Sequence, residues 1–283
     1  MSGKTQDRGS AGLGAFLADE FEPAFWTPEL LDEESAWWAH VPFAFWLVAA
    51  TRPRIVLEVG VDRGVSYAAF CEAALRLRLD CRLHGVDLWS DPGGDERFDD
   101  FAKFHDHRYA GFSRLMRIRS VDALDAFADG SIDLLHINAS GGLLDAREEF
   151  RRWRKKISPR GIVLIHGEPV EDLHNGQSFF VFPRGEGLAL AAPGPQTPDA
   201  VAKLFALDDN SARRLRERFG LLGERWAERA TILGLLRQFE SDFQTLRPKD
   251  EDFRLTVADR FRNSLIKTAA DPFRYFRPKR RRR

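Results

Sequence analysis

The sequence predicts an α/β protein built on a mainly parallel, seven-stranded sheet that is followed by a helical C-terminal extension. From Arg54 onward, short apolar runs alternate with amphipathic helical stretches five times over. This alternation is typical of a parallel sheet with helices on both faces. Two further apolar runs near residue 190 are separated only by Pro-Arg-Gly-Glu-Gly, which indicates a terminal hairpin that completes the sheet.

The residues before the sheet predict a loose leader and one buried helix. Residues 1–20 are rich in glycine, serine and polar side chains. Thr27 and Pro28 predict a helix start, because a capping hydroxyl is followed by proline at the first helical position. The apolar stretch Trp37–Ala50 reads as a helix that ends before Arg52-Pro53. Since it falls short of a bilayer span, we expect it to be buried.

Seven runs are predicted as strands. They are Ile55–Val59, Leu83–Asp87, Leu115–Arg119, Ile132–Asn138, Gly161–His166, Ser178–Phe182 and Leu188–Ala192. The clearest helix between them is Leu143–Ile157, in which apolar side chains recur at intervals of three and four residues.

The chain is expected to divide into four segments, which are a flexible leader (1–20), the sheet domain (21–195), the helical extension (196–270) and a basic tail (271–283). Between Ser211 and Leu246, apolar residues follow a near-heptad spacing. This stripe fits either a helix packed on its own domain or a helix that binds a partner, including a second copy in a homodimer. A second short helix is expected near Val257–Thr268.

Composition narrows the class of protein. The 283 residues are 43% hydrophobic and 12% aromatic, which excludes a wholly disordered or collagenous chain. Basic and acidic residues both number 43, so a nucleic-acid binder that depends on overall positive charge is disfavoured. Cys71 and Cys81 are too few for a disulfide scaffold and match no zinc spacing. We read them as buried thiols of a cytoplasmic protein.

The C-terminus ends in the basic run Lys279–Arg283, with aromatic residues shortly before it. Three readings remain open for this tail. It is a solvated charge run, it contacts an anionic membrane surface at the inner face of the membrane, or it makes nonspecific contacts with nucleic acid.

A glycine-containing turn follows the first predicted strand. The strand runs through Glu58, Gly60 and Gly64 bracket the turn, and a helix begins near Val65. In open parallel sheets, ligands bind at the carboxyl ends of the strands. Glycines allow the backbone to approach a ligand, and free amides at a helix start attract its anionic end. The same residues also fit an ordinary tight turn.

Asp87 ends the next predicted strand. Its carboxylate is placed to accept two hydrogen bonds from the ribose hydroxyls of a nucleoside, or to cap the following helix. Together with the glycine turn, it favours a nucleoside cofactor.

Several blocks resemble the class I S-adenosylmethionine-dependent methyltransferases, which have a Rossmann-like fold. The branch is a bacterial one associated with glycosyltransferases and surface-polysaccharide biosynthesis. The resemblance covers residues 35–192, and its blocks include Ser35–Trp46, Glu58–Tyr67, Gly85–Trp89, Arg108–Leu115, Gly130–Ile137 and Phe150–Gly161.

The resemblance implies S-adenosyl-L-methionine as cofactor. It implies that Glu58, Gly60, Gly64 and Ser66 border the methionine part, that Asp87 holds the ribose, and that Trp89 and Ser120 lie near the adenosine.

The acceptor half departs from the family pattern. Positions that are acidic or histidine in relatives are Asn138, Gly141 and Gly167 here. A hydroxyl acceptor needs its proton removed or polarised by a base or a metal, and asparagine is a poor base and a poor anchor for a hard cation. We therefore expect no metal. Asn138 and His166 are expected to face the acceptor, with catalysis by proximity and orientation.

His166 or Glu168 could act as base, although a histidine that is only hydrogen-bonded within the loop fits equally. The predicted function is O-methylation of a sugar or glycan hydroxyl. The alternative is a catalytically inactive methyltransferase-fold protein that acts as partner or scaffold for a glycosyltransferase. A nicotinamide-dependent dehydrogenase is disfavoured, because the third glycine of its fingerprint is missing.

Overall fold

The computed structural model describes residues 19–31, 35–139, 145–167 and 179–245. The chain forms two compact units. The described part of the first contains residues 19–30, 35–139, 145–167 and 179–224, including the whole sheet, and the described part of the second consists mainly of residues 225–245. The predicted leader before Asp19, the short helix near Val257–Thr268 and the basic tail lie outside the described residues.

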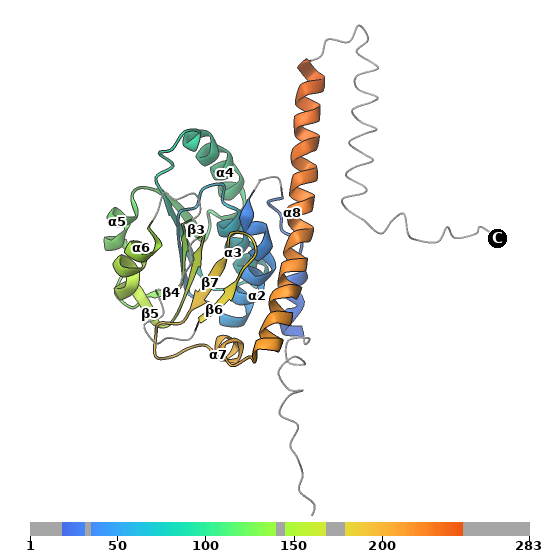
Figure 1. Ribbon diagram of the computed structural model, residues 1–283. Helices are drawn as coiled ribbons and strands as arrows, with labels where there is room; N and C mark the ends of the chain where they lie inside the picture. The colour runs from blue at the N-terminus through green and yellow to red at the C-terminus, as the bar shows by residue number, and fades with distance from the viewer. Residues whose placement is uncertain (1–18, 32–34, 140–144, 168–178, 246–283) are drawn as a thin grey trace, which may run out of the picture. The chain divides into compact units, whose positions relative to one another are not determined.

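The sheet has seven strands in the order β3-β2-β1-β4-β5-β7-β6 (Figure 1). The first five pair in parallel, and β7 pairs antiparallel with both β5 and β6. The strands are β1 (Ile55–Val59), β2 (Arg82–Asp87), β3 (Ser113–Arg117), β4 (Ile132–Asn138), β5 (Ile157–His166), β6 (Phe179–Phe182) and β7 (Leu188–Ala191). The predicted fold class, with its parallel sheet and terminal hairpin, is confirmed.

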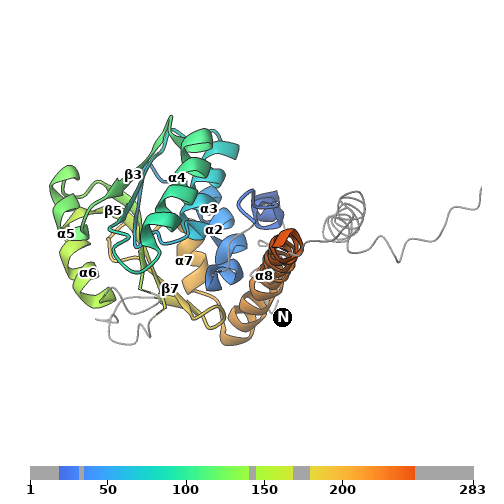
Figure 2. The same cartoon turned by 90° about the horizontal axis from the view of Figure 1, so that it is seen from above.

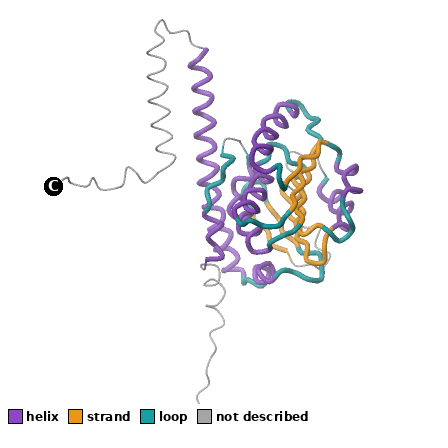
Figure 3. Tube along the Cα trace, turned by 180° about the vertical axis from the view of Figure 1, so that it is seen from behind, coloured by secondary structure: helices purple, strands orange, loops and turns teal. Residues whose placement is uncertain are grey.

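Helices cover both faces of this sheet, with α2, α3 and α4 on one side and α5 and α6 on the other (Figures 2 and 3). In chain order the helical segments are η2 (Asp19–Phe25), η3 (Ala36–His40), α2 (Val41–Thr51), α3 (Val65–Arg76), α4 (Gly94–Tyr109), α5 (Ser120–Ala123), η4 (Leu124–Ala126), α6 (Ala146–Trp153), η6 (Arg154–Lys156), α7 (Asp199–Phe205) and α8 (Asp209–Thr245).

Two predicted boundaries are wrong for identifiable reasons. The strand predicted at Leu115–Arg119 begins at Ser113 instead, because the Ser113 hydroxyl is buried and bonded to Tyr67. The helix predicted to reach Ile157 ends in η6 at Lys156, and Ile157 is already the first residue of β5. There Ile157 pairs with Ile132 of β4.

The helix start predicted at Thr27 and Pro28 is also wrong, since residues 26–30 are not helical. The Thr27 carbonyl accepts a hydrogen bond from Arg76 at 2.7 Å. The Glu29 amide donates to Glu72 at 3.0 Å. Both partners belong to α3, so tertiary contacts hold this segment extended where the local capping signal favoured a helix.

The apolar helix α2 is packed into the interior of the first unit. Its residues from Val41 to Val48 are all buried. The ring of Phe43 lies 4.5 Å from that of Phe182 in β6 and 5.4 Å from that of Phe219 in α8. Within the described segments, no helix is both long enough and apolar enough to cross a membrane.

Helix α8 confirms the predicted helix between Ser211 and Leu246 over most of its length. Phe219 is 1% exposed and contacts Phe43, which supports packing on its own domain for the first part of the helix. The residues from Arg225 belong to the second unit, and for them the partner-binding reading stays a prediction.

Candidate functional site

The carboxyl ends of four parallel strands bring the predicted site residues to one edge of the sheet. Asp87 ends β2, Asn138 ends β4 and His166 ends β5, while Glu58 is the next-to-last residue of β1. The crossover direction reverses between β1 and β4, because β2 and β3 lie on one side of β1 and β4 and β5 on the other. Ligands of open α/β sheets bind at such a switch point.

The turn after β1 requires both of its glycines. Gly60 and Gly64 have φ angles of +85° and +81°, which side-chain-bearing residues rarely adopt. The Gly60 amide donates to Val86 at 2.9 Å. A Cβ on Gly64 would lie 2.2 Å from the ring of Phe101 in α4. Gly64 is therefore needed for helix packing, whether or not a ligand also approaches the turn.

Asp87 joins the two loops that follow β1 and β2. It accepts hydrogen bonds from the backbone amides of Asp62 and Trp89, both at 2.9 Å. The indole of Trp89 in turn donates to the Asp62 carbonyl at 2.8 Å. Asp87 does not cap the next helix, since α4 begins at Gly94 with Gly93 as its N-cap. Each carboxylate oxygen has a second lone pair, so Asp87 can also accept hydroxyl donors.

An open hollow of about 570 Å³ lies beside this pair of loops. It is lined by residues 89–96 and by Arg117. Trp89 forms part of its wall, with its ring 2% exposed and 4.9 Å from that of Phe98. Arg117 pairs with Asp87 in the β2–β3 register and forms an ion pair with Asp95. Asp87, the acid that was predicted to hold a ribose, is not among the lining residues and precedes Trp89 by two positions.

Glu58 and Ser66 lie beneath the turn and contact each other. The Ser66 hydroxyl donates to Glu58 Oε1 at 2.6 Å, and Glu58 Oε2 lies 3.1 Å from Nδ1 of His136. Both carboxylate and imidazole are fully buried. Burial raises the pKa of Glu58 well above its usual range and lowers the pKa of His136 to about 3.

Trp37 and His136 complete this buried chain, and the sequence did not single out either residue for it. The Trp37 indole donates to His136 Nε2 at 3.2 Å. Since an indole N–H is only a donor, Nε2 carries the lone pair and the proton of the neutral ring is on Nδ1, facing Glu58. Trp37 lies within Ser35–Trp46, which resembles the methyltransferase family, but no local sequence pattern indicates that its partner is in β4.

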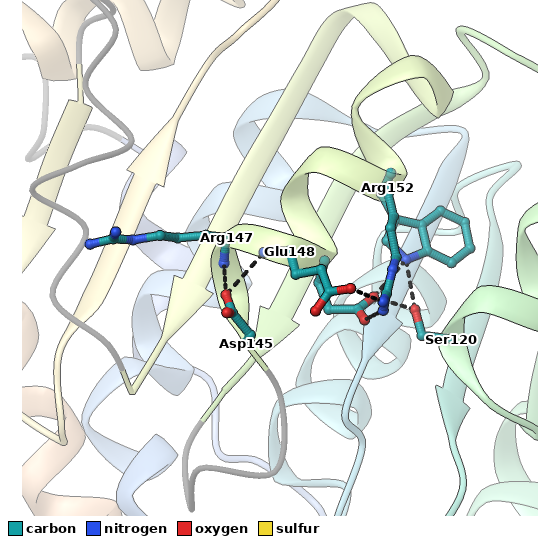
Figure 4. A network of polar contacts seen from close by, with 7 residues as sticks. Ser120, Asp145, Arg147, Glu148 and Arg152 are labelled. Carbon is teal, nitrogen blue, oxygen red and sulfur yellow. Dashed lines mark hydrogen bonds and ion pairs between the residues drawn. The ribbon is translucent and has the colours of Figure 1, made fainter.

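Ser120 links α5 to α6 (Figure 4). Its hydroxyl donates to Glu149 and accepts a hydrogen bond from the Trp153 indole at 2.8 Å. Arg152 forms an ion pair with Glu149. Ser120 thus has a structural role between these helices, and its predicted place near the adenosine stays a prediction.

Asn138 and His166 lie opposite each other in β4 and β5. The Oδ1 atom of Asn138 is 2.9 Å from Nδ1 of His166, and Nε2 of His166 is 2.7 Å from the Gly185 carbonyl oxygen. The same carbonyl lies 3.2 Å from Nε2 of His40. Burial, and next the nearby His136, lower the pKa of His166 to about 4.

The Gly185 turn packs tightly against η3. Gly185 has a φ angle of +56°, and a Cβ on it would lie 2.4 Å from the Ala36 carbonyl oxygen. Glu168 and Gly141 lie outside the described residues. Within the described ranges, no group of three or more histidine, cysteine, aspartate or glutamate side chains is arranged to hold a metal ion.

Comparison with known families finds a match over part of the sheet domain. Residues 57–167 match the family model described as "Methyltransferase domain". The match spans β1 to β5 and contains the glycine turn, Asp87 and Asn138. Residues 57–167 therefore combine a Rossmann-like fold with a match to a methyltransferase-domain model.

The chain is also similar to a Sinorhizobium fredii protein named "Uncharacterized protein y4gI", at 33% identity over 234 residues. That alignment covers 75% of this chain, but the chain spans only 25% of the relative's length.

Among solved structures, cofactor-bound Rv0187 from MTB is 18% identical with a TM-score of 0.44, over 66% of this chain and 92% of that one. A methyltransferase from Geobacter sulfurreducens is 16% identical with a TM-score of 0.43, over 54% of this chain and 76% of that one.

Proposed function

We propose that this chain is an S-adenosylmethionine-dependent methyltransferase that transfers a methyl group to a hydroxyl oxygen of a sugar or glycan. The observation that carries the proposal is the methyltransferase-domain match over residues 57–167. It contains both the glycine turn after β1 and the acid that ends β2. These two features meet at the edge of the sheet where α/β proteins bind ligands.

The residues at this edge fit an adenosyl group. Asp87 is half-buried, keeps acceptor capacity for two ribose hydroxyls, and precedes by two positions Trp89, which lines the hollow. When bound, S-adenosylmethionine supplies a methyl group on a positively charged sulfur. Gly60 and Gly64 shape the turn beside it. Glu58 and Ser66 act from below by holding that turn, since both side chains are buried against each other.

The acceptor half of the site is polar and neutral. Asn138 and His166 are its described polar side chains at the ends of β4 and β5, and burial keeps the imidazole uncharged at neutral pH. Neither asparagine nor this histidine is set up as a strong base. The proposed catalysis therefore relies on proximity and orientation of the hydroxyl. The sugar or glycan class of acceptor is supported only by the resemblance of the sequence blocks.

The partners remain part of the proposal. The region that matches this chain makes up 25% of the Sinorhizobium fredii relative. This supports a role for the methyltransferase fold beside a further domain, and the proposed partner is a glycosyltransferase. In α8, Ile232, Leu235 and Phe239 are exposed at intervals of three and four, which supports a homodimer through this helix. Peripheral contact of the basic tail with the inner face of a membrane is also part of the proposal, since it would suit surface-polysaccharide biosynthesis.

Calorimetry of the full chain with S-adenosylmethionine tests the proposal. We expect saturable binding, and we expect Asp87→Ala to weaken it tenfold or more, about 1.4 kcal/mol. Asp100→Asn is the matched control, because Asp100 is exposed on α4 and pairs with nearby Lys103. No binding by the folded chain at millimolar cofactor would overturn the function. Binding without transfer of labelled methyl groups to a panel of sugars would favour the inactive alternative.

A further inference from the structure

Arg97, near the start of α4, contacts both of the loops that follow β1 and β2. Its Nε atom lies 2.8 Å from Oδ1 of Asp62, which belongs to the loop after β1. Its Nη2 atom forms an ion pair with Asp91, and Nη1 donates to the Pro92 carbonyl at 3.2 Å. Asp91 and Pro92 line the open hollow beside Trp89. One guanidinium group therefore joins the wall of the hollow to the turn after β1.

The two loops that Arg97 joins contain strained backbone. Asp62 and Trp89 have φ angles of +47° and +48°, a conformation that is uncommon for residues other than glycine and least common for bulky ones. Asp87 accepts hydrogen bonds from both of their amides, and the Trp89 indole donates to the Asp62 carbonyl. Strained residues persist only where surrounding contacts hold them, and they collect at ligand clamps and active sites. This pair therefore points to a functional role for the two loops.

The charge of Arg97 contributes to the same contact. The Arg97 side chain is 17% exposed, and it pairs with carboxylates from two different loops, those of Asp62 and Asp91. Without their shared cation, the two carboxylates would repel each other and favour separation of the loops. A lysine offers one compact ammonium group in place of the planar fork, so it cannot keep all the contacts that the guanidinium makes.

The packing of α4 on its own unit does not depend on Arg97. The buried residues of this helix are Gly94, Phe101, His105 and Tyr109. At the start of the helix, Gly94 packs closely against the loop after β2, since a Cβ on it would lie 2.2 Å from the Trp89 carbonyl oxygen. A substitution at Arg97 therefore changes the contacts with the loops and leaves the packed face of α4 as it is.

Resting on the function proposed above, we propose that Arg97 is a positioning residue of the cofactor site, which holds the two loops together so that Asp87 and Trp89 are preorganised for the nucleoside part of S-adenosylmethionine. A site whose loops are already ordered binds its ligand more tightly, because less freedom is lost on binding. Arg97 acts through Asp62 and Asp91, which lie in the loops after β1 and β2. Its role is therefore in cofactor affinity and not in the chemical step.

Hydrogen exchange of the full chain without cofactor tests the arrangement. In Arg97→Gln, we expect the backbone amides of Asp62 and Trp89 to exchange faster by on the order of tenfold. Arg108→Gln is the matched control, because Arg108 lies on the same helix and its Nε atom pairs with Glu29 at 2.7 Å. The control should exchange at the native rate at both amides. The native rate in Arg97→Gln as well would overturn the proposal.

Calorimetry with S-adenosylmethionine is the second measurement. We expect Arg97→Gln to weaken binding by about tenfold and Arg108→Gln to bind as the native chain does. Neither substitution alters the packed face of α4, so the thermal midpoints of the two variants should agree within about 2 °C.

Two results of the binding measurement would overturn the proposal. One is unchanged affinity in Arg97→Gln, and the other is a loss of affinity that accompanies a lower midpoint in this variant than in the control. A native chain that binds no cofactor fails the proposed function and, with it, the cofactor role of Arg97. The exchange measurement decides independently whether Arg97 holds the two loops.

Discussion

Trp37 and His136 are 99 positions apart and are joined by a buried hydrogen bond of 3.2 Å between indole Nε1 and imidazole Nε2. This bond connects the short helix η3 to the centre of the sheet. His136 in turn contacts Glu58, and Glu58 accepts a hydrogen bond from Ser66 in the first turn of α3. The N-terminal segment therefore helps to support the carboxyl-terminal edge of the sheet at β1 and β4.

Replacing Trp37 by phenylalanine removes the donor and leaves His136 Nε2 buried without it. Because an unsatisfied buried polar atom costs about 1–3 kcal/mol, and the smaller ring also leaves a void, we expect a loss of about 2 kcal/mol or more in the free energy of unfolding. Urea denaturation measures it. Trp26→Phe is the control, since the Trp26 indole bonds to Glu22 at the surface, and we expect a change within about 0.5 kcal/mol. Equal losses in both variants would contradict the role of Trp37.

The buried histidines predict acid sensitivity. Burial lowers the pKa of His40 and His136 to about 3 and that of His166 to about 4. In the unfolded chain these pKa values are about 6.5. At acidic pH the unfolded state therefore binds more protons than the folded state. The free energy of unfolding falls as the pH drops below about 6.5 toward the pKa values of the folded chain.

His40→Gln isolates one of these contributions, because glutamine is neutral and can still donate to Gly185. By about pH 5 the His40 contribution is expected to cost on the order of 2 kcal/mol. The stability of the native chain relative to His40→Gln should fall by this amount between about pH 8 and pH 5. A pH-independent difference for His40→Gln would disprove the assignment.

Gly64→Ala should destabilise the chain through the Phe101 contact. The substitution combines a φ of +81° with a Cβ placed 2.2 Å from the Phe101 ring. Gly130→Ala is the matched control, because its φ is +69° but no atom lies within 4 Å of the added Cβ. We expect Gly130→Ala to lower the free energy of unfolding by about 1 kcal/mol. We expect Gly64→Ala to lower it by about 1–3 kcal/mol more. If both variants unfold at the same urea concentration, the packing role of Gly64 is refuted.

Asp145 caps helix α6 (Figure 4). Its carboxylate accepts hydrogen bonds from the amides of Arg147 at 2.9 Å and Glu148 at 3.0 Å. Loss of an N-cap costs about 1 kcal/mol, so we expect this loss in Asp145→Ala and little change in Asp145→Ser, which keeps a capping oxygen. Thermal unfolding compares the two variants, and the same midpoint for both would show that the cap contributes nothing.

Local sequence signals predicted the bounds of an element correctly where the tertiary contacts favour the same local structure. β1 and β4 begin and end where their apolar runs do, and α3 begins directly after Gly64. The capping signal at Thr27 failed, because Arg76 and Glu72 hold that segment by contacts that no local pattern contains. Ile157 was assigned to a helix by its spacing, but pairing with Ile132 places it in β5.

By itself, the sequence determined the α/β class, the order of the strands along the chain, the positions of Gly60 and Gly64 in the turn after β1, and the position of Asp87 at the end of β2. These follow from periodicity and from residues with unusual backbone freedom, which act within a few positions. Only the tertiary structure decided which side chains meet across β1, β4, β5 and η3. It buried Glu58 with Ser66 and His136, and it bound both ring nitrogens of His166. Hydrogen-bond partners and desolvation depend on neighbours that are distant in the chain, so neither could be read from local order.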